Sequence, residues 1–242
     1  AYDVWEHLLR SVQCGADKNY PLDIRLTALF HDISKPETRR WVKTGSGNTG
    51  QWTFYGHEVV GARITRKILT NLRYPTKLID KVTTMVRWHM FFSDTEHITL
   101  SAVRRMIVNV GRDNIWDLMN VRICDRIGTG RPKEDPYRLR KYHAMIDEAM
   151  RDPISVGMLN IHGKRIMEIT DTRPGPKIGF ILHALLEEVL DDPLKNTKEY
   201  LENRSKELIQ IEERELQALG EKGKQLKEEV DEGEIKKIRS KH

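Results

Sequence analysis

The sequence has few cysteines and no long apolar run, and both shortages narrow the class of protein. Only two cysteines, Cys14 and Cys124, occur in 242 residues, and neither belongs to a CxxC pair. A disulfide framework and a cysteine-bound zinc are therefore not expected, and a reducing, cytoplasmic location is the default expectation. No apolar stretch approaches the roughly 18 residues that span a membrane, so we expect no membrane partner.

Alternating strand patterns are also scarce. The one candidate is the Gly/Ser/Thr-rich stretch 42–53, which is a loop or a short hairpin. Elsewhere apolar residues recur at helical spacing, which predicts an all-α protein, a helical bundle with a C-terminal helical extension. We expect helices over 3–12, 21–34, 56–73, 76–90, 100–111, 113–130, 136–152 and 196–219, with Asp3 as the cap of the first, and a turn followed by a helix within 173–193.

Acidic residues are fewer than basic ones in the part of the chain that should fold. Residues 199–242 carry ten Lys/Arg against twelve Asp/Glu, so the totals of 41 and 36 leave 31 against 24 in residues 1–198. A basic body permits a nucleic acid or phosphate partner without proving one. The chain opens on "AYDVWEH" without a methionine, and we expect it to be a piece of a longer protein.

What the sequence does contain is a set of histidines and aspartates on apolar helix faces. "LFHDISKP" places a histidine and an aspartate at the end of an apolar run, and further members come from other predicted helices. A lone histidine on such a face is usually a hydrogen-bonded core residue. A buried carboxylate is costly unless it is paired or binds a cation. The candidate ligands of a divalent metal (Mn, Fe, Co, Ni or Zn) are His7, His31, Asp32, His57, His89 and Asp125.

The order H … HD … D, carried here by His7, His31, Asp32 and Asp125, resembles the HD superfamily of metal-dependent phosphohydrolases. His57 and His89 match the extra histidines of its two-metal members. The resemblance implies one or two divalent ions, with Mg also possible, and Asp32 as the bridging ligand. It also implies a helical bundle of the HD-domain type.

Five further segments resemble the C-terminal half of bacterial tRNA nucleotidyltransferases, the CCA-adding and poly(A) polymerase family. The match runs from about residue 2 to residue 205 and rests on "LTALFHDISKP", "FYGHEVVGA", "AVRRMI", "CDRIGTGRPKEDPYRLRKY" and "RPGPKIGFILHALLEEVLDDP". The family's catalytic head, with its Gly-Ser motif and paired aspartates, has no counterpart here. Nucleotide addition by this chain alone is therefore not expected. A second departure is Ser34, where the family more often has glycine.

Several cations could meet a phosphate ester near such a centre. Lys35 follows His31 by one helical turn, and Arg126 follows Asp125, so both join Asp32 as candidate catalytic residues. Ordinary surface charge is the competing explanation for the arginines. The candidate phosphate- or RNA-binding residues come from three segments. They are Arg104 and Arg105 in the predicted helix 100–111, Arg131, Lys133, Arg138 and Arg140 in the basic segment 122–142, and Arg173 and Lys177 in "RPGPKIG".

Two functions remain open from the sequence. The first is a metal-dependent phosphohydrolase that acts on nucleotide or RNA-end phosphates, 2′,3′-cyclic phosphodiesters among them, with RNA binding attached, tRNA in particular. The second is a non-catalytic tRNA-binding body of a nucleotidyltransferase. We expect an HD phosphohydrolase domain over 1–150, an RNA-binding helical region over 151–205 and a charged helical tail over 206–242.

Overall fold

Helices make up most of the protein, as the sequence predicts. The computed structural model describes residues 3–43, 50–90, 98–131 and 136–220. Within these ranges the strands are limited to β1 (Arg40–Lys43) and β2 (Gly50–Thr53), and the all-α prediction is confirmed. The α-helices are α1 (Val4–Asp17), α2 (Leu22–Phe30), α3 (Lys35–Thr38), α4 (His57–Asn71), α5 (Thr76–Trp88), α6 (Leu100–Val110), α7 (Ile115–Gly128), α8 (Tyr137–Ala149), α9 (Gly163–Thr170), α10 (Pro176–Asp191) and α11 (Lys198–Leu208).

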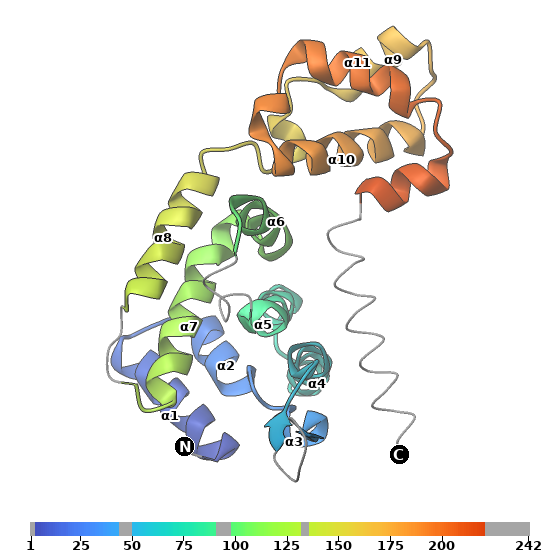
Figure 1. The fold of residues 1–242 in the computed structure, drawn as a ribbon. Helices are drawn as coiled ribbons and strands as arrows, with labels where there is room; N and C mark the ends of the chain where they lie inside the picture. The colour runs from blue at the N-terminus through green and yellow to red at the C-terminus, as the bar shows by residue number, and fades with distance from the viewer. Residues whose placement is uncertain (1–2, 44–49, 91–97, 132–135, 221–242) are drawn as a thin grey trace. The chain divides into compact units, whose positions relative to one another are not determined.

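The described residues form two compact units that do not follow the order of the chain. The first comprises those within 1–96 and 110–142, and the second those within 97–109 and 143–220. In the first unit α2 packs against α1, α5 and α7, while α4 packs against α5 and α3 (Figure 1). Every helix that carries a candidate metal ligand belongs to this unit.

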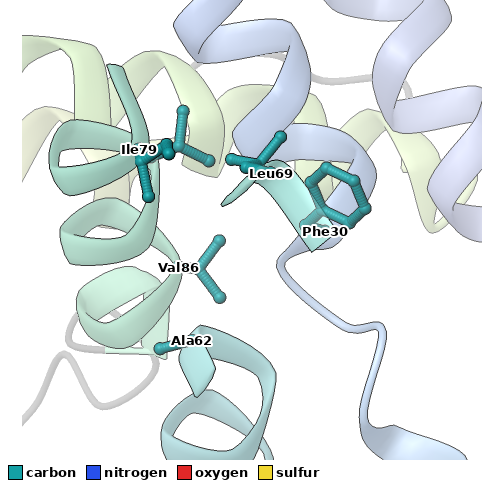
Figure 2. Packing of buried hydrophobic residues seen from close by; sticks show 6 residues of the cluster. Phe30, Ala62, Leu69, Ile79 and Val86 are labelled. Atoms are coloured by element: carbon teal, nitrogen blue, oxygen red, sulfur yellow. The ribbon is translucent and has the colours of Figure 1, made fainter. Parts of the chain in front are cut away.

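An apolar cluster joins α2, α4 and α5 (Figure 2). It contains Phe30 at the end of α2, Ala62 and Leu69 on α4, and Ile79 and Val86 on α5. Each fully buried side chain of this size stabilises the fold by about 1.5–3 kcal/mol relative to exposure. The cluster thereby holds the end of α2, the start of α4 and the end of α5 in place. His31 follows the first of these, His57 occupies the second, and His89 follows the third.

The predicted helix over 21–34 is shorter than expected. Helix α2 ends at Phe30, residues 31–34 form a turn, and Pro36 lies in the first turn of α3 instead of just past the end of α2. Proline restrains the residue before it but fits the first turn of a helix, so a new helix begins where the old one was expected to stop. The turn lets His31 and Asp32, adjacent in sequence, both point inward.

The amino-terminal helix begins as predicted. The Asp3 side chain accepts a hydrogen bond of 2.7 Å from the Glu6 backbone N–H, which satisfies one of the free donors at the start of α1. The described residues at the two ends of the stretch 42–53 pair as a hairpin does, since β1 and β2 are antiparallel with Trp41 opposite Trp52.

The second unit contains α9, α10 and α11, which pack on one another. The prediction of one helix over 196–219 is wrong, because α11 ends at Leu208 and helix resumes only at 213–220. Thr197 caps α11, and its hydroxyl oxygen accepts a hydrogen bond from the Tyr200 backbone N–H. Neither glycine nor proline stands at the break, and nothing in the structure explains it. Among the described residues, no helix is long and apolar enough to cross a membrane.

Candidate metal centre

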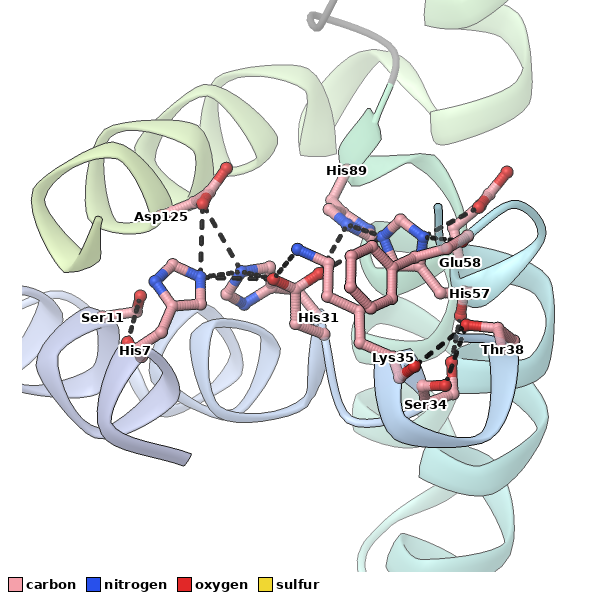
Figure 3. Close-up of polar contacts among 12 residues, drawn as sticks. His7, Ser11, His31, Ser34, Lys35, Thr38, His57, Glu58, His89 and Asp125 are labelled. Atoms are coloured by element: carbon pink, nitrogen blue, oxygen red, sulfur yellow. Dashed lines mark hydrogen bonds and ion pairs between the residues drawn. The ribbon is translucent and has the colours of Figure 1, made fainter. Parts of the chain in front are cut away.

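Six side chains from five segments of the first unit converge on one point (Figure 3). His31 and Asp32 lie in the turn after α2 and are each 1% exposed. The others come from separate helices, and together they are the six candidates of the sequence: His7 on α1, His31 and Asp32, His57 at the start of α4, His89 after α5 and Asp125 on α7. The fold therefore gathers every residue that the pattern singled out.

Three of the four histidine rings are held by the backbone behind them. The Nδ1 atoms of His31, His57 and His89 lie 2.8, 2.7 and 2.6 Å from backbone carbonyl oxygens, each three residues earlier in the chain. A carbonyl oxygen can only accept a hydrogen bond, so each Nδ1 carries the proton. The Nε2 atom of each neutral ring then presents a lone pair to the centre, the arrangement typical of histidines that bind metals.

The Nε2 atoms face one another in pairs. His57 Nε2 lies 3.2 Å from His89 Nε2, and His7 Nε2 lies 3.0 Å from His31 Nε2. Two lone pairs at this distance repel each other unless a cation lies between or beside them. In the first pair both Nδ1 atoms are already donors, so the cation must be a proton on one Nε2 or a metal ion.

Asp32 stands between the two pairs of rings. Its Oδ2 lies 3.3 Å from His7 Nε2 and 3.5 Å from His31 Nε2, whereas its Oδ1 lies 3.2 Å from His57 Nε2 and 3.6 Å from His89 Nε2. Oδ1 is buried and has no hydrogen-bond partner among the described residues. Asp32 thus belongs to two groups that could each hold a metal ion, one with His7 and His31 and one with His57 and His89.

Asp125 adds a second carboxylate on the side of His7. Its Oδ1 lies 3.4 Å from His7 Nε2 and 3.6 Å from His31 Nε2, and the side chain is 13% exposed. The guanidinium of Arg122, one turn earlier on α7, pairs with the other carboxylate oxygen. Imidazole and carboxylate donors in this mixture fit Mn, Fe, Co, Ni or Zn.

Proton binding in the centre reflects these charges. Burial opposes the charge on Asp32, but the neighbouring histidines, His31 first, outweigh it and lower the pKa of Asp32 well below its usual range. Burial likewise opposes the charge on His7, but Asp125 and Asp32 outweigh it and raise the pKa of His7 to about 9. For His89 burial prevails and lowers the pKa of the ring. The raised pKa of His7 favours a proton on this ring in the metal-free centre, and a metal ion that binds the ring must displace it.

Lys35 lies at the edge of the centre, on the first turn of α3. Its Nζ is 2.5 Å from Asp32 Oδ2 and 5.7 Å from the centroid of the Phe54 ring. The side chain is partly exposed, so the ammonium group stands between the buried carboxylate and the surface. This is the position in which a cation can meet an incoming anion.

Two supporting contacts were not foreseen from the sequence. The Ser34 hydroxyl donates to the His57 backbone carbonyl at 2.5 Å, so the serine that departs from the family's glycine ties the turn to α4. Gly128 on α7 lies against α1, where a Cβ atom would come within 2.1 Å of Ser11 Oγ and 3.0 Å of His7 Nδ1. Both depend on close approach in three dimensions, which has no signal in the sequence.

The predicted cations are divided between the two units. Arg126, Arg131 and Arg138 line a pocket of about 540 Å³ whose wall includes Asp125. Burial, with Arg131 and Arg122 nearby, lowers the pKa of Arg126, as expected where like charges converge. Arg140 is exposed on α8, and Lys133 lies outside the described residues.

Arg104 and Arg105 belong to the second unit and serve it internally. Arg104 is buried and donates to Asp152 and to the Leu190 carbonyl, while Arg105 pairs with Glu187. Because carboxylates of the same unit balance the charges of Arg104 and Arg105, we do not propose either arginine as a phosphate contact. Arg173 and Lys177 flank the start of α10, where the sequence places them.

Comparison with known proteins agrees with this geometry. The model of the HD domain family matches residues 4–136, the span that contains all six converging side chains. The chain belongs to the HD domain family. The predicted membership of this superfamily of metal-dependent hydrolases is thereby confirmed.

The chain is also similar to two curated proteins. One is the CC-adding tRNA nucleotidyltransferase of Thermus thermophilus, 34% identical over 186 residues, which are 76% of this chain and 40% of that protein. The other is the A-adding tRNA nucleotidyltransferase of Deinococcus radiodurans, 27% identical over 190 residues, 76% of this chain and 42% of that protein. The predicted resemblance to this family is confirmed, and the chain spans about two fifths of these relatives' length.

Proposed function

We propose that this chain is a metal-dependent phosphohydrolase that cleaves phosphate mono- or diesters at nucleotide or RNA ends, 2′,3′-cyclic phosphates among them. The observation that carries the proposal is the buried Asp32 carboxylate between two pairs of histidine Nε2 atoms. A divalent ion bound there would activate water and stabilise the charge that develops on the phosphate oxygens. We assign this chemistry to residues 1–150.

The protein's own residues would orient the reaction. The carbonyl groups behind His31, His57 and His89 keep the rings from turning, so the ligands need little rearrangement to bind. The Lys35 ammonium is poised to bind a phosphate oxygen beside Asp32. These roles make Asp32 and Lys35 the residues on which hydrolysis depends most.

RNA binding is the second part of the proposal. The pocket lined by Arg126, Arg131 and Arg138 opens next to Asp125, so a phosphate held there would lie beside the metal centre. With Arg140 on α8, these side chains would contact phosphates, which gives affinity without reading the base sequence. The similarity to two tRNA nucleotidyltransferases favours tRNA as the RNA.

A binding body without hydrolase activity is the second candidate. It is favoured by the same similarity, because the chain matches about two fifths of enzymes named for nucleotide addition. In that case the chain would hold tRNA for chemistry performed elsewhere. The two candidates differ in whether the centre turns over a phosphate ester.

The test measures bound metal and the hydrolysis of 2′,3′-cAMP and of a chromogenic phosphodiester. We expect the wild type to bind one or two divalent ions and to hydrolyse an ester, and Asp32→Ala to lose both properties. Asp113→Asn, at an exposed aspartate outside the centre, serves as the matched control and should behave as the wild type. Absence of metal from the wild type, or equal activity in Asp32→Ala, would leave the binding body as the remaining candidate.

RNA binding is tested separately through its dependence on salt. The affinity for tRNA should fall steeply as salt is raised, because each phosphate contact releases counterions. Neutralising Arg138 and Arg140 should weaken binding and flatten the slope. A slope that is flat in the wild type would refute the proposed contacts.

A further inference from the structure

The hairpin of β1 and β2 exposes two tryptophans side by side. Trp41 and Trp52 are directly opposite in the register, their ring centroids are 5.2 Å apart, and each side chain is 47% exposed. Val42 and Tyr55 add exposed apolar surface to the same segment. A cluster of large exposed apolar side chains on a small element indicates an interaction site more often than a scattered surface residue does.

Both indole rings are held in place. A Cβ atom at Gly50 would come within 2.6 Å of Trp41 Cε2, so the absence of a side chain there lets the Trp41 ring lie across the neighbouring strand. The Arg39 guanidinium stacks on the Trp52 ring, 3.7 Å from its centroid. Rings fixed in this way lose little conformational freedom when a flat partner stacks on them.

The charged residues of the segment that carries the two rings, residues 38–57, are of one sign. Residues 38–57 contain Arg39, Arg40 and Lys43 and no aspartate or glutamate. Arg39 and Lys43 are exposed. Aromatic faces among cations are the combination by which proteins bind single-stranded nucleic acid, because bases stack on the rings while the cations meet the phosphates.

The hairpin leads directly into the candidate metal centre. Phe54 directly follows β2, and its carbonyl oxygen accepts a hydrogen bond from His57 Nδ1 at 2.7 Å. The Phe54 ring lies 5.7 Å from the Lys35 ammonium, which in turn contacts Asp32. Two residues of extended strand span roughly 7 Å, so Trp52 stands only a short step from Phe54.

We propose that Trp41 and Trp52 form a stacking platform for unpaired bases of a single-stranded RNA end. The inference rests on the proposed function in one respect, that the terminal phosphate of this RNA enters the metal centre past Lys35. The natural substrate is then an oligonucleotide with an unpaired end, and not a free mononucleotide or an RNA duplex. Duplex bases are already stacked on one another and leave no free face for the two rings.

The binding test compares three proteins on two RNAs. Each protein is titrated with a labelled ten-residue oligoadenylate and with a duplex of the same length. The three proteins are the wild type, the double variant Trp41→Ala/Trp52→Ala and the control Trp5→Ala. The control removes an even more exposed tryptophan (65%) from α1. Loss of one stacked base corresponds to roughly a tenfold loss of affinity. We expect at least this loss for oligoadenylate in the double variant, less than a twofold change on the duplex, and no change in the control.

A second double variant and a spectroscopic signal guard against a misfolded hairpin. Trp41→Phe/Trp52→Phe keeps aromatic faces and should regain most of the affinity that the alanine variant loses. Oligoadenylate should quench tryptophan emission in the wild type and in Trp5→Ala, and should fail to do so in both double variants. Equal affinity of the wild type and the alanine variant would overturn the platform, as would a wild type that binds the duplex as tightly as the single strand.

Failure of the platform and failure of the hydrolase are separable. Hydrolysis of the chromogenic phosphodiester, which has no base to stack, should be the same in wild type and alanine variant. If the wild type hydrolyses nothing yet binds oligoadenylate through the two tryptophans, the platform stands and the hydrolase falls. If it hydrolyses the ester but prefers no single-stranded RNA, the platform falls alone, and the exposed rings then serve a protein partner.

Discussion

Substituting alanine for Gly128 is the sharpest test of how His7 is positioned. The new Cβ atom would lie 2.1 Å from Ser11 Oγ, 2.9 Å from the His7 carbonyl oxygen and 3.0 Å from His7 Nδ1. Distances under 3 Å to backbone cannot be relieved by rotating a side chain. Helix α1 must therefore move away from α7 and take the His7 ring with it.

The size of the effect follows from packing. Adding a methyl group to a well-packed contact between helices costs about 1–3 kcal/mol, and for a protein of this size each 1 kcal/mol lowers Tm by about 2–4 °C. We expect a loss of roughly 4–8 °C for a central value of about 2 kcal/mol. Displacing a ligand also weakens metal binding, by about 10–100-fold if it acts as the loss of a supporting contact does.

The assay is thermal denaturation of the metal-free protein together with titration by a divalent metal. Gly15→Ala is the matched control, since Gly15 is a buried glycine inside α1 whose Cβ would meet atoms no closer than 3.4 Å. Alanine in a helix interior stabilises by up to about 1 kcal/mol relative to glycine, so this variant should be unchanged or more stable. Ser11→Ala should partly rescue Gly128→Ala by removing the nearest atom. A Gly128→Ala protein with wild-type Tm and metal affinity would refute the reasoning.

Three further predictions concern charge. Lys35→Met should reduce kcat for a phosphodiester about 100-fold while the metal content stays constant, and Lys35→Arg should have an intermediate kcat. Steady-state kinetics and metal analysis test this, and an unchanged kcat would contradict it. Metal affinity should rise about tenfold per pH unit from pH 6.5 towards 9, because the metal must displace the proton from His7, whose pKa in the folded protein is raised to about 9. The same proton stabilises the metal-free protein, and this stabilisation is full below pH 6.5 and is lost as the pH rises towards 9. Calorimetry in two buffers should detect the released proton, and a pH-independent affinity would count against it. Arg104→Met should lower the free energy of unfolding, measured by chemical denaturation, by about 2–3 kcal/mol, because Asp152 and the Leu190 carbonyl lose a charged donor. The affinity for tRNA should not change. A specific loss of tRNA affinity would instead make Arg104 a phosphate contact.

The candidate ligands could be identified from the sequence because a buried carboxylate has few explanations. Asp32 and Asp125 stand in apolar segments, and the cost of burying them directs attention to histidines on other helices. The helices that bring these residues together follow from apolar spacing alone. Helix α2 ends four residues before the predicted bound at residue 34, and the turn at residues 31–34 is what lets His31 and Asp32 face the same way.

Other features depend on contacts between distant segments and have no local signal. Nothing near Arg104 in the sequence announces Asp152, 48 residues later, as its partner. The fit of Gly128 against Ser11 depends on the distance between two helices. The pair of tryptophans could have been suspected from the short hairpin, but their edge-to-face contact depends on the register that places Trp41 opposite Trp52.

In the metal-free centre, Lys35 helps to balance the charge of Asp32. The Asp32 carboxylate is buried with its pKa held low, so it remains ionised and needs positive charge nearby. His7 and Lys35 provide it from two sides, at 3.3 and 2.5 Å from Oδ2. A cation bound by the histidines and Asp32 removes the need for both: the proton must leave His7, and the Lys35 ammonium is repelled from Oδ2. Lys35 is partly exposed and lies near the ring of Phe54, the residue that follows β2, so the displaced ammonium group would be available to the phosphate of an RNA end bound at the hairpin.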